Sequence, residues 1–261
     1  MTSRKNLNNI PLHRTYHENS KNLEIDPVDK SEAPQDWFEV EYKTYDRGEK
    51  IDLPCPDPVE TVPLERTIDT RRSPVTFEPT SIGRETLGRL LARTAGITER
   101  GETDDDHLRA YPSGGARYPL ELYTTVLRAK QVETGVYHYD VRQNALNKTP
   151  QDDVHEFSEF VYGSLENAVM LVFVTADLER TTKKYGERGY RYANLEAGHA
   201  MQNLCLVSES VGLGCRPYGG FLEDQADEYL CLHGNETTLY VGAVGRPATA
   251  SQHDNNEDES R

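Results

Sequence analysis

A lysine and a tyrosine lie side by side at Lys184 and Tyr185, in a short basic and aromatic stretch that runs on to Tyr192. A Lys next to a Tyr can share proton-transfer work where a pocket moves the two pKa values towards neutrality. The plainer alternative is an exposed helix start that carries basic side chains. Taken alone, the local sequence favours that alternative.

A second group of polar residues is Arg71-Arg72-Ser73, which is followed by Pro74. Two guanidinium groups beside a hydroxyl and free backbone N–H groups suit a phosphate, because arginine offers forked donors. Paired arginines on an acidic protein are more often a solvated or salt-bridged face. Both interpretations remain open at this point.

Two pairs of adjacent glycines occur at different places in the chain, each in a stretch that also contains proline and tyrosine. Gly114 and Gly115 lie between two prolines in the stretch 111–119, and Gly219 and Gly220 lie in the stretch 215–221. Glycine lets the backbone approach a flat ligand closely, and at a sheet edge it often marks a bulge. For the first pair, a plain connector from helix to strand is an equal alternative.

The elements that must position these residues alternate between helical and extended patterns. A first helix is predicted over 81–95, capped by Ser81 and stopped by Gly96. A longer helix is predicted over 192–211. The residues that recur at i+3 and i+4 spacing along it, which we call the stripe and expect to form one face, are Leu195, Gly198, Gln202, Cys205, Leu206, Val207 and Val211.

Four strands are predicted between and around these helices. Their ranges are 121–129, 136–139, 168–175 and 239–244, and the third is apolar throughout, as in a strand covered on both faces. This order fits one α+β layer domain better than two domains. We assign it to residues 14–247, with a flexible N-terminus over 1–13 and a disordered acidic tail over 248–261.

Charge and composition exclude several classes of function. With 44 acidic and 29 basic residues, the net charge of −15 argues against nucleic acid and anionic membranes as partners. The longest apolar run, 168–174, is too short to span a bilayer, and no secretory signal is apparent. The four cysteines form no Cys-x-x-Cys pair, so we expect no metal site and a cytoplasmic protein with reduced thiols. The acidity is typical of either a salt-adapted or an ordinary acidic cytosolic protein.

Taken together, the order and spacing of the motifs resemble the flavin-dependent nitroreductase superfamily. The resemblance is to its SagB-type (thiazole/oxazole oxidase-like) dehydrogenases, and it covers most of the chain. The matching segments are 16–21, Arg71-Arg72-Ser73, 112–119, 135–140, 196–199 with 202–204, 217–221 and 244–247.

The resemblance implies an α+β nitroreductase-like fold, with a central, mostly antiparallel sheet flanked by helices and a long dimer-interface helix. It implies a homodimer with FMN as cofactor. The implied cofactor-binding residues are Arg71, Arg72 and Ser73, the loop residues Pro112, Ser113, Gly114 and Gly115, then Gly219, Gly220 and Arg246. In this superfamily the loop reaches the flavin of the partner subunit, and Arg246 could reach the phosphate.

The same resemblance makes Lys184 and Tyr185 the catalytic pair. The implied reaction is oxidation of azoline-type heterocycles in peptides, by proton abstraction from carbon and hydride transfer to flavin N5. Two alternatives remain, an NAD(P)H-dependent FMN reductase of quinones or nitro-compounds and a non-catalytic scaffold of the same fold. Ala116 and Gly219 differ from drug-reducing nitroreductases and favour the SagB-type subgroup, whereas Pro74 and Thr76 depart from its usual Arg-Arg-Ser motif.

Overall fold

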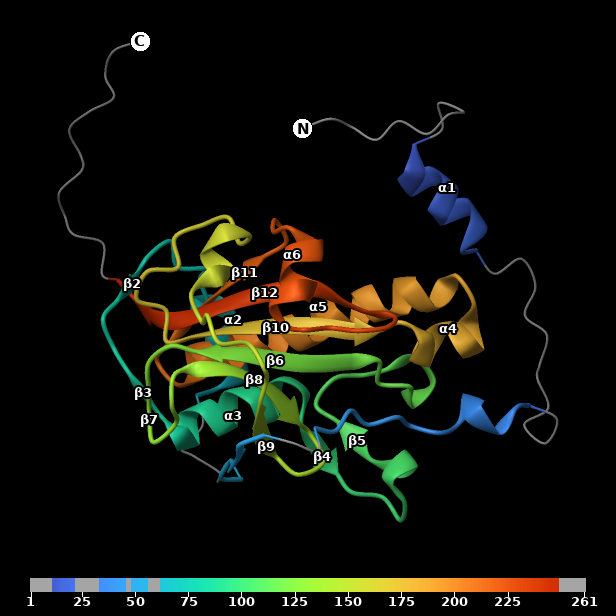
Figure 1. The fold of residues 1–261 in the computed structure, drawn as a ribbon, viewed down its shortest axis with the longest axis horizontal. Helices are drawn as coiled ribbons and strands as arrows, with labels where there is room; N and C mark the ends of the chain where they lie inside the picture. The colour runs from blue at the N-terminus through green and yellow to red at the C-terminus, as the bar shows by residue number, and fades with distance from the viewer. Residues whose placement is uncertain (1–10, 22–32, 46–47, 56–61, 249–261) are drawn as a thin grey trace, which may run out of the picture.

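The computed structural model describes residues 11–21, 33–45, 48–55 and 62–248. A central sheet has the order β1-β9-β8-β6-β10-β12-β11, with β2 paired to β12, and each of these pairs is antiparallel (Figure 1). The strands are β1 (Lys50–Asp52), β2 (Phe77–Glu78), β6 (Leu120–Val126), β8 (Gly135–Asp140), β9 (Ala145–Lys148), β10 (Met170–Asp177), β11 (Gly214–Tyr218) and β12 (Glu236–Pro247). The expected mostly antiparallel α+β fold is confirmed.

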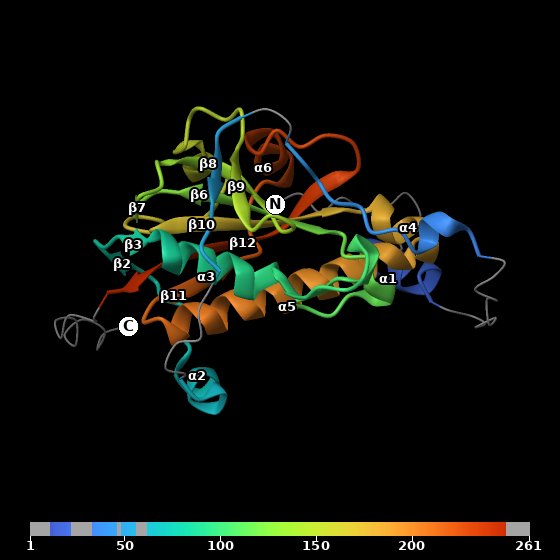
Figure 2. The ribbon, with the colours of Figure 1, turned by 90° about the horizontal axis from the view of Figure 1, so that it is seen from below.

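Helices cover both faces of this sheet. Figure 2 shows α3 and α5 beneath one face and α6 above the other. The helices are α1 (Leu12–Asn19), α2 (Leu64–Thr70), α3 (Arg84–Ala95), α4 (Glu179–Tyr185), α5 (Arg188–Ser210) and α6 (Glu223–Tyr229). Two short strand pairs complete the described chain, β3 (Ile82–Gly83) with β7 (Ala129–Lys130), which is parallel, and β4 (Ile97–Glu99) with β5 (Leu108–Arg109).

The central strand β10 contributes to two hydrophobic cores, one on each face. Met170, Val172 and Val174 pack into the core shared with α3 and α5. Leu171 and Phe173 pack into the core that contains Ala226 and Tyr229 of α6. Since successive side chains of a strand point to opposite faces, a strand covered on both sides must be apolar at every position. The predicted doubly covered strand is therefore confirmed.

The predicted start of the first helix is wrong. Ser81 does not cap it, because the helix begins at Arg84 with Gly83 as its N-cap, and no side chain caps it. Ile82 lies in β3, which pairs with β7 in parallel, so this residue belongs to a strand although the apolar pattern assigned it to the helix. Gly96 ends the helix as predicted.

The long helix α5 begins at Arg188, four residues earlier than predicted, and only the C-terminal part of the predicted stripe faces the core, where Cys205 is buried and Val207 packs against it. Leu195 is 56% exposed, and Gly198 and Gln202 share this outward face. The buried face instead carries small residues, and includes Ala193, Ala197, Ala200, Met201 and Leu204. The helix packs closely on β12 where Gly242 has no side chain. A Cβ at Gly242 of β12 would lie 3.0 Å from both Leu204 and Met201.

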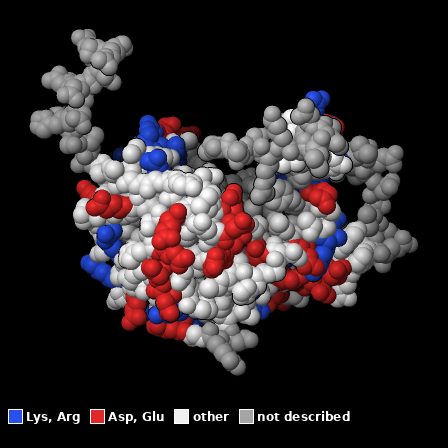
Figure 3. Space-filling view, turned by 45° about the horizontal axis from the view of Figure 1, so that its top comes forward, with Lys and Arg blue, Asp and Glu red and all other residues white. Residues whose placement is uncertain are grey.

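Acidic side chains are spread over the face shown in Figure 3, while Lys and Arg form smaller groups near its margins. Among the described residues, Glu121, Asp140 and Glu196 are the acids that are buried. Within the described ranges, no helix is both long and apolar enough to cross a membrane. Most of the predicted flexible ends, 1–13 and 248–261, lies outside the described residues, and α1 begins at Leu12.

Candidate functional site

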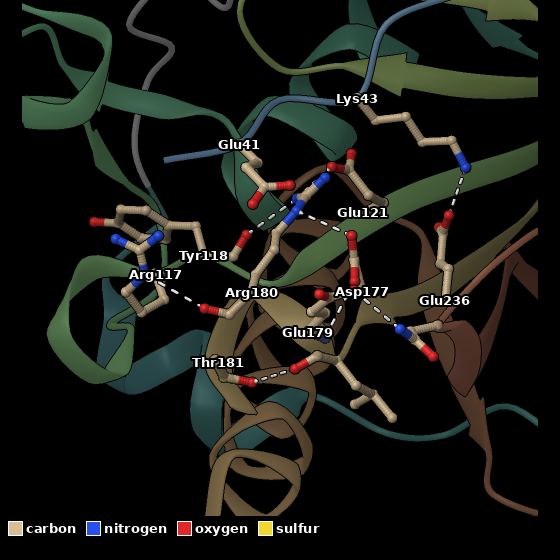
Figure 4. A network of polar contacts seen from close by, with 12 residues as sticks. Glu41, Lys43, Arg117, Tyr118, Glu121, Asp177, Glu179, Arg180, Thr181 and Glu236 are labelled. Atoms are coloured by element: carbon tan, nitrogen blue, oxygen red, sulfur yellow. Dashed lines mark hydrogen bonds and ion pairs between the residues drawn. The ribbon is translucent and has the colours of Figure 1, made fainter. Parts of the chain in front are cut away.

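The helix that carries Lys184 and Tyr185 is fixed to the sheet by Arg180, which is 4% exposed (Figure 4). Its Nη1 donates to Glu121 Oε1 of β6 at 2.6 Å, and its Nε lies 3.6 Å from Asp177 Oδ2. Burial alone would raise the pKa of Glu121, but Arg180 and the hydrogen bond to His138 outweigh it and hold that pKa well below its usual range. A buried carboxylate with two such partners fixes the position of α4 against β6.

The glycine-containing loop is tied to the same helix through Arg117 and Tyr118. Arg117 Nε donates to the Arg180 carbonyl at 3.4 Å, and Arg180 Nη1 donates to the Tyr118 carbonyl at 3.4 Å. Arg117 Nη1 also donates to the Trp37 carbonyl at 2.8 Å, so the N-terminal segment is attached to the same point. Loop, helix and N-terminal segment therefore share one anchor.

Gly115 brings the loop against the proposed catalytic pair. Its φ is +64°, in the left-handed region that favours glycine. A Cβ at this position would collide with the Tyr185 hydroxyl and lie 3.2 Å from Lys184 Nζ. Because Gly115 has no side chain, the Tyr185 hydroxyl and the Lys184 Nζ can approach the loop backbone closely.

Lys184 and Tyr185 lie half-buried in the last turn of α4, so the alternative of an exposed helix start is wrong. The Lys184 Nζ lies 5.0 Å from the centre of the Phe38 ring and 5.5 Å from that of Tyr185. The Tyr185 ring meets Tyr192 edge-on at 5.0 Å. Burial, followed by the influence of Tyr192, raises the pKa of Tyr185, so its phenol keeps its proton at neutral pH.

Glu196 is a site residue that the sequence patterns did not single out. From the buried face of α5, its Oε1 accepts hydrogen bonds from Ser113 Oγ at 3.0 Å and from the Gly114 backbone N–H at 2.9 Å. It lines a pocket of about 250 Å³ together with Pro112, Ser113, Gly114, Tyr192, Leu195 and His199. The available signal was a carboxylate among alanines on the buried side of a helix.

The Arg71-Arg72-Ser73 segment follows α2 and is open to solvent, apart from a half-buried Arg71. Arg71 Nη1 lies 3.4 Å from Ser73 Oγ, and Arg72 Nη1 donates to the Asp69 carbonyl at 2.8 Å. Neither guanidinium pairs with a carboxylate within the described part of the chain. Both cations are therefore available to an anionic ligand.

Arg246 lies close to this segment, because β2 and β11 pair with the same end of β12. A Cβ at Gly214 would lie 2.8 Å from Pro74 Cγ and 3.0 Å from Pro247 Cγ. Arg246 Nε is 3.6 Å from Glu78 Oε1, so this cation is partly neutralised. Arg216, which the motif survey passed over, donates to the Pro74 carbonyl at 3.4 Å and adds a further cation.

Gly219 and Gly220 follow β11 at its other end. Neither has an atom within 4 Å of the position a Cβ would take, and both are exposed. Gly219 lies five positions after Gly214, which is roughly 16 Å of extended chain. The backbone here is bare and accessible, as a flat ligand requires.

The predicted site residues therefore form two separate groups in one chain. Gly114 packs against Tyr192 near the start of α5. Arg71 lies near the other end of α5. The pKa of the Cys205 thiol there is lowered, chiefly by its hydrogen bond with Cys215 and to a smaller extent by the positive charge of Arg71. Cys205 lies thirteen positions after Tyr192 in the helix, which corresponds to roughly 20 Å along its axis. Lys184, Tyr185 and the residues of 112–115 come together, whereas Arg71, Arg72, Ser73 and Arg246 lie elsewhere.

The sheet, the long helix and these two groups define an α+β protein with a glycine-rich, ligand-accessible site. The Nitroreductase family model matches residues 68–246, more than half of the chain. The chain therefore belongs to the nitroreductase family.

Relatives and solved structures agree with this assignment. A nitroreductase-like protein of Methanocaldococcus jannaschii, MJ1384, is 32% identical over 76% of this chain and 98% of its own length. The microcin B17-processing protein McbC of Escherichia coli is 32% identical, over 44% of this chain and 45% of its own. The trifolitoxin-processing protein TfxB of Rhizobium leguminosarum bv. trifolii is 36% identical, over 41% of this chain and 31% of its own.

Two solved structures share the fold at lower identity. A nitroreductase-family structure from Ralstonia eutropha JMP134 has a TM-score of 0.66 at 22% identity, covering 80% of this chain and 94% of its own. The E. coli microcin synthetase McbBCD complex with truncated pro-MccB17 contains a chain with a TM-score of 0.59 at 20% identity. That match covers 91% of this chain and 92% of the other.

Proposed function

We propose that this nitroreductase-family oxidoreductase is an FMN-dependent, SagB-type dehydrogenase. The observation that carries the proposal is the meeting of Gly115 with Tyr185 and Lys184, which joins a ligand-accessible backbone to a possible proton-transfer pair. The glycine lets the Tyr185 hydroxyl reach the exposed backbone of the loop, and the Lys-Tyr pair supplies acid–base groups beside it.

The chemistry of the residues fits FMN. Arg71, Arg72 and Ser73 present to a phosphate a hydroxyl and two guanidinium groups that form no ion pair with any described carboxylate, with Arg246 close by. Gly219 and Gly220 offer bare backbone at the other end of β11, where a ring could lie flat. An elongated cofactor with a dianionic phosphate at one end and an aromatic ring at the other matches this arrangement.

The separation of the two groups along α5 supports the proposal of a homodimer. Leu195 and Gly198 lie on the outward face of that helix, and Leu64 and Ile68 of α2 are also exposed. A two-fold contact across α5 would bury this apolar face. It would also bring the arginines of one subunit towards the loop and the Lys-Tyr pair of the other.

In the proposed mechanism, bound FMN supplies a two-electron acceptor for a substrate C–H bond. The protein holds the substrate carbon beside Lys184 and Tyr185. Lys184 in its neutral amine form would take the proton from the substrate carbon, and the two electrons would pass to FMN as hydride. The Tyr185 phenol, which keeps its own proton at neutral pH, donates a hydrogen bond in the same site. Glu196 holds Ser113 and Gly114 in place.

Azoline-type heterocycles in peptides are the proposed substrates, and the microcin- and trifolitoxin-processing relatives support this choice. NAD(P)H-dependent reduction of quinones or nitro-compounds is the second candidate, since the Methanocaldococcus jannaschii relative matches over nearly its whole length. We place the activity in one cytoplasmic domain spanning 14–247, because both cores share a single sheet.

Visible absorbance of the purified protein tests the proposal. We expect flavin bands near stoichiometric FMN, retained on gel filtration or restored by soaking with FMN. Anaerobic mixing with an azoline-containing peptide should bleach the bound flavin. Bleaching by NADPH followed by rapid quinone reduction, with no response to the peptide, would select the reductase. A protein that binds no flavin under any condition would be a scaffold.

A further inference from the structure

The carboxyl group of Glu196 is only half satisfied by its surroundings. The residue is 3% exposed, and its Oε1 accepts both the Ser113 and the Gly114 hydrogen bonds. Its Oε2 is buried and has no hydrogen-bond partner among the described residues. A buried polar atom without a partner costs free energy, so its position at the pocket calls for a role.

We propose that Glu196 is the positioning residue of the 112–117 loop, and that covering the pocket beside it binds one proton at Oε2. The proposal rests on the proposed function, since the covering ligand is the flavin. The proton comes from solvent and returns to it when the pocket opens. Oε1 keeps both loop hydrogen bonds in either protonation state.

The charges around Glu196 explain why a proton can be held there. Burial raises its pKa to about 7, opposed by the hydrogen bonds from Gly114 and Ser113 and by the positive charge of Arg109. Arg109 is only a partial counter-ion. It lies over the Tyr118 ring at 4.9 Å, and its Nη1 is 3.4 Å from the Leu120 carbonyl.

Other titratable groups lie near the carboxyl. They are Tyr111, Tyr185 and Tyr192, with His199 on the pocket wall and Glu121 on β6. No cation forms an ion pair with Glu196 within the described residues. Covering the pocket removes the water beside the buried carboxyl group, which disfavours the carboxylate further and favours the neutral acid.

Ligand binding is then linked to proton uptake. Above pH 7 the open pocket holds a carboxylate, and covering it requires protonation, so affinity falls as the pH rises. The limiting slope for one proton is a tenfold loss of affinity per pH unit. Glu196→Gln keeps an acceptor oxygen for both loop bonds and presents an amide where the neutral acid has its O–H, so its affinity should lose this dependence.

FMN affinity between pH 6 and pH 9, measured by flavin fluorescence quenching, tests the linkage. We expect the wild-type dissociation constant to rise at least about fivefold across this range. The factor by which the dissociation constant rises between pH 6 and pH 9 should be at least fivefold smaller for E196Q than for the wild type. Glu209→Gln, on the same helix, should show the same rise as the wild type. The titration of the FMN phosphate is common to all three proteins and cancels in the comparison. An E196Q protein that binds FMN with the wild-type pH dependence overturns the linkage.

Hydrogen exchange tests the positioning role without flavin. In Glu196→Ala we expect faster exchange of the Gly114 amide, read in peptides covering 112–117, whereas E196Q and Glu209→Ala exchange like the wild type. Unchanged exchange in E196A overturns the positioning role. A wild-type protein that binds no FMN at any pH would refute the proposed function and the linkage, and the exchange comparison would still decide the positioning role.

Discussion

The Tyr185 hydroxyl occupies the space into which a side chain at Gly115 would project. One residue ends α4 and the other lies in the loop before β6, and Arg180 ties both segments to the sheet. The absence of one methyl group therefore lets the backbone of the loop reach the proposed catalytic pair.

Gly115→Ala should reduce turnover with little extra loss of stability. The left-handed φ costs about 1–2 kcal/mol for alanine, and the Tyr185 ring can rotate away from the new methyl group. Gly212→Ala is the matched control, since its φ is +73° and the space around it is open. Urea unfolding should give similar free energies for both variants, while only Gly115→Ala loses activity. Equal activities would show that the Gly115–Tyr185 contact has no catalytic role.

Lys184→Ala should lower kcat by about 10²–10⁴-fold and leave FMN bound, because general acid–base catalysis contributes about that much. Lys183→Ala is the control, since the Lys183 ammonium forms exposed ion pairs with Glu41 and Glu179. Stopped-flow reduction of the bound flavin measures the effect. Loss of FMN from Lys184→Ala would instead assign this residue a structural role.

The double variant Arg71→Ala/Arg72→Ala should weaken FMN binding by about 10–150-fold, since hydrogen bonds to charged groups contribute about 1.5–3 kcal/mol. Riboflavin has no phosphate, so its affinity should be unchanged. Arg66→Ala, an exposed arginine on α2, should not affect either ligand. Isothermal titration of both flavins measures the difference, and an equal loss for riboflavin would contradict a phosphate role.

Glu121→Gln should destabilise the fold by about 3–5 kcal/mol at pH 7, because it leaves Arg180 buried with a weakened partner. Glu179→Gln removes an exposed pair with Lys183 and keeps an amide oxygen that can accept the Asn235 hydrogen bond, so it should cost no more than about 0.5 kcal/mol. The lowered pKa of Glu121 stabilises the fold above the unfolded-state pKa, and this stabilisation is lost as the pH falls towards the folded-state value. The unfolding free energy of the wild type should therefore fall more steeply below pH 4.5 than that of Glu121→Gln.

Leu195→Asp should convert the proposed dimer to monomer, because it places a charge on the outward face of α5. Leu108→Asp is a matched control on β5, where the leucine is also exposed. Light scattering after gel filtration gives the mass of each. A wild-type monomer at working salt would refute the dimer, and an unchanged Leu195→Asp dimer would place the interface elsewhere.

Much of the fold could be predicted from the sequence because buried positions are apolar and recur with the period of the helix or strand that contains them. The continuous apolar run of β10 identifies a strand covered on both faces, and Gly96 marks a helix end. The start of α3 was missed because pairing of Ile82 with Ala129 depends on a contact distant in sequence. The N-terminal part of the buried face of α5 was misjudged because alanines, rather than large apolar residues, occupy it there, while Leu195 points outward.

The site could be predicted as a set of residues but not as an arrangement. The order of motifs indicated Lys184, Tyr185 and the glycine loop, and the structure brings these together. Glu196 was quoted only as part of the helix motif, since its contacts with Ser113 and Gly114 lie about 80 residues back in the chain. That the arginines lie near the other end of α5 also follows from tertiary packing, which the motif order does not record.

Placing the two residue groups near opposite ends of α5 has a genetic consequence. If each site takes its arginines from one subunit and its Lys-Tyr pair from the other, a chain defective in Arg71 and a chain defective in Lys184 can complement each other. Each pure variant would be inactive. Mixed dimers would carry one site with both defects and one intact site, so co-expression would restore up to a quarter of wild-type activity on random pairing.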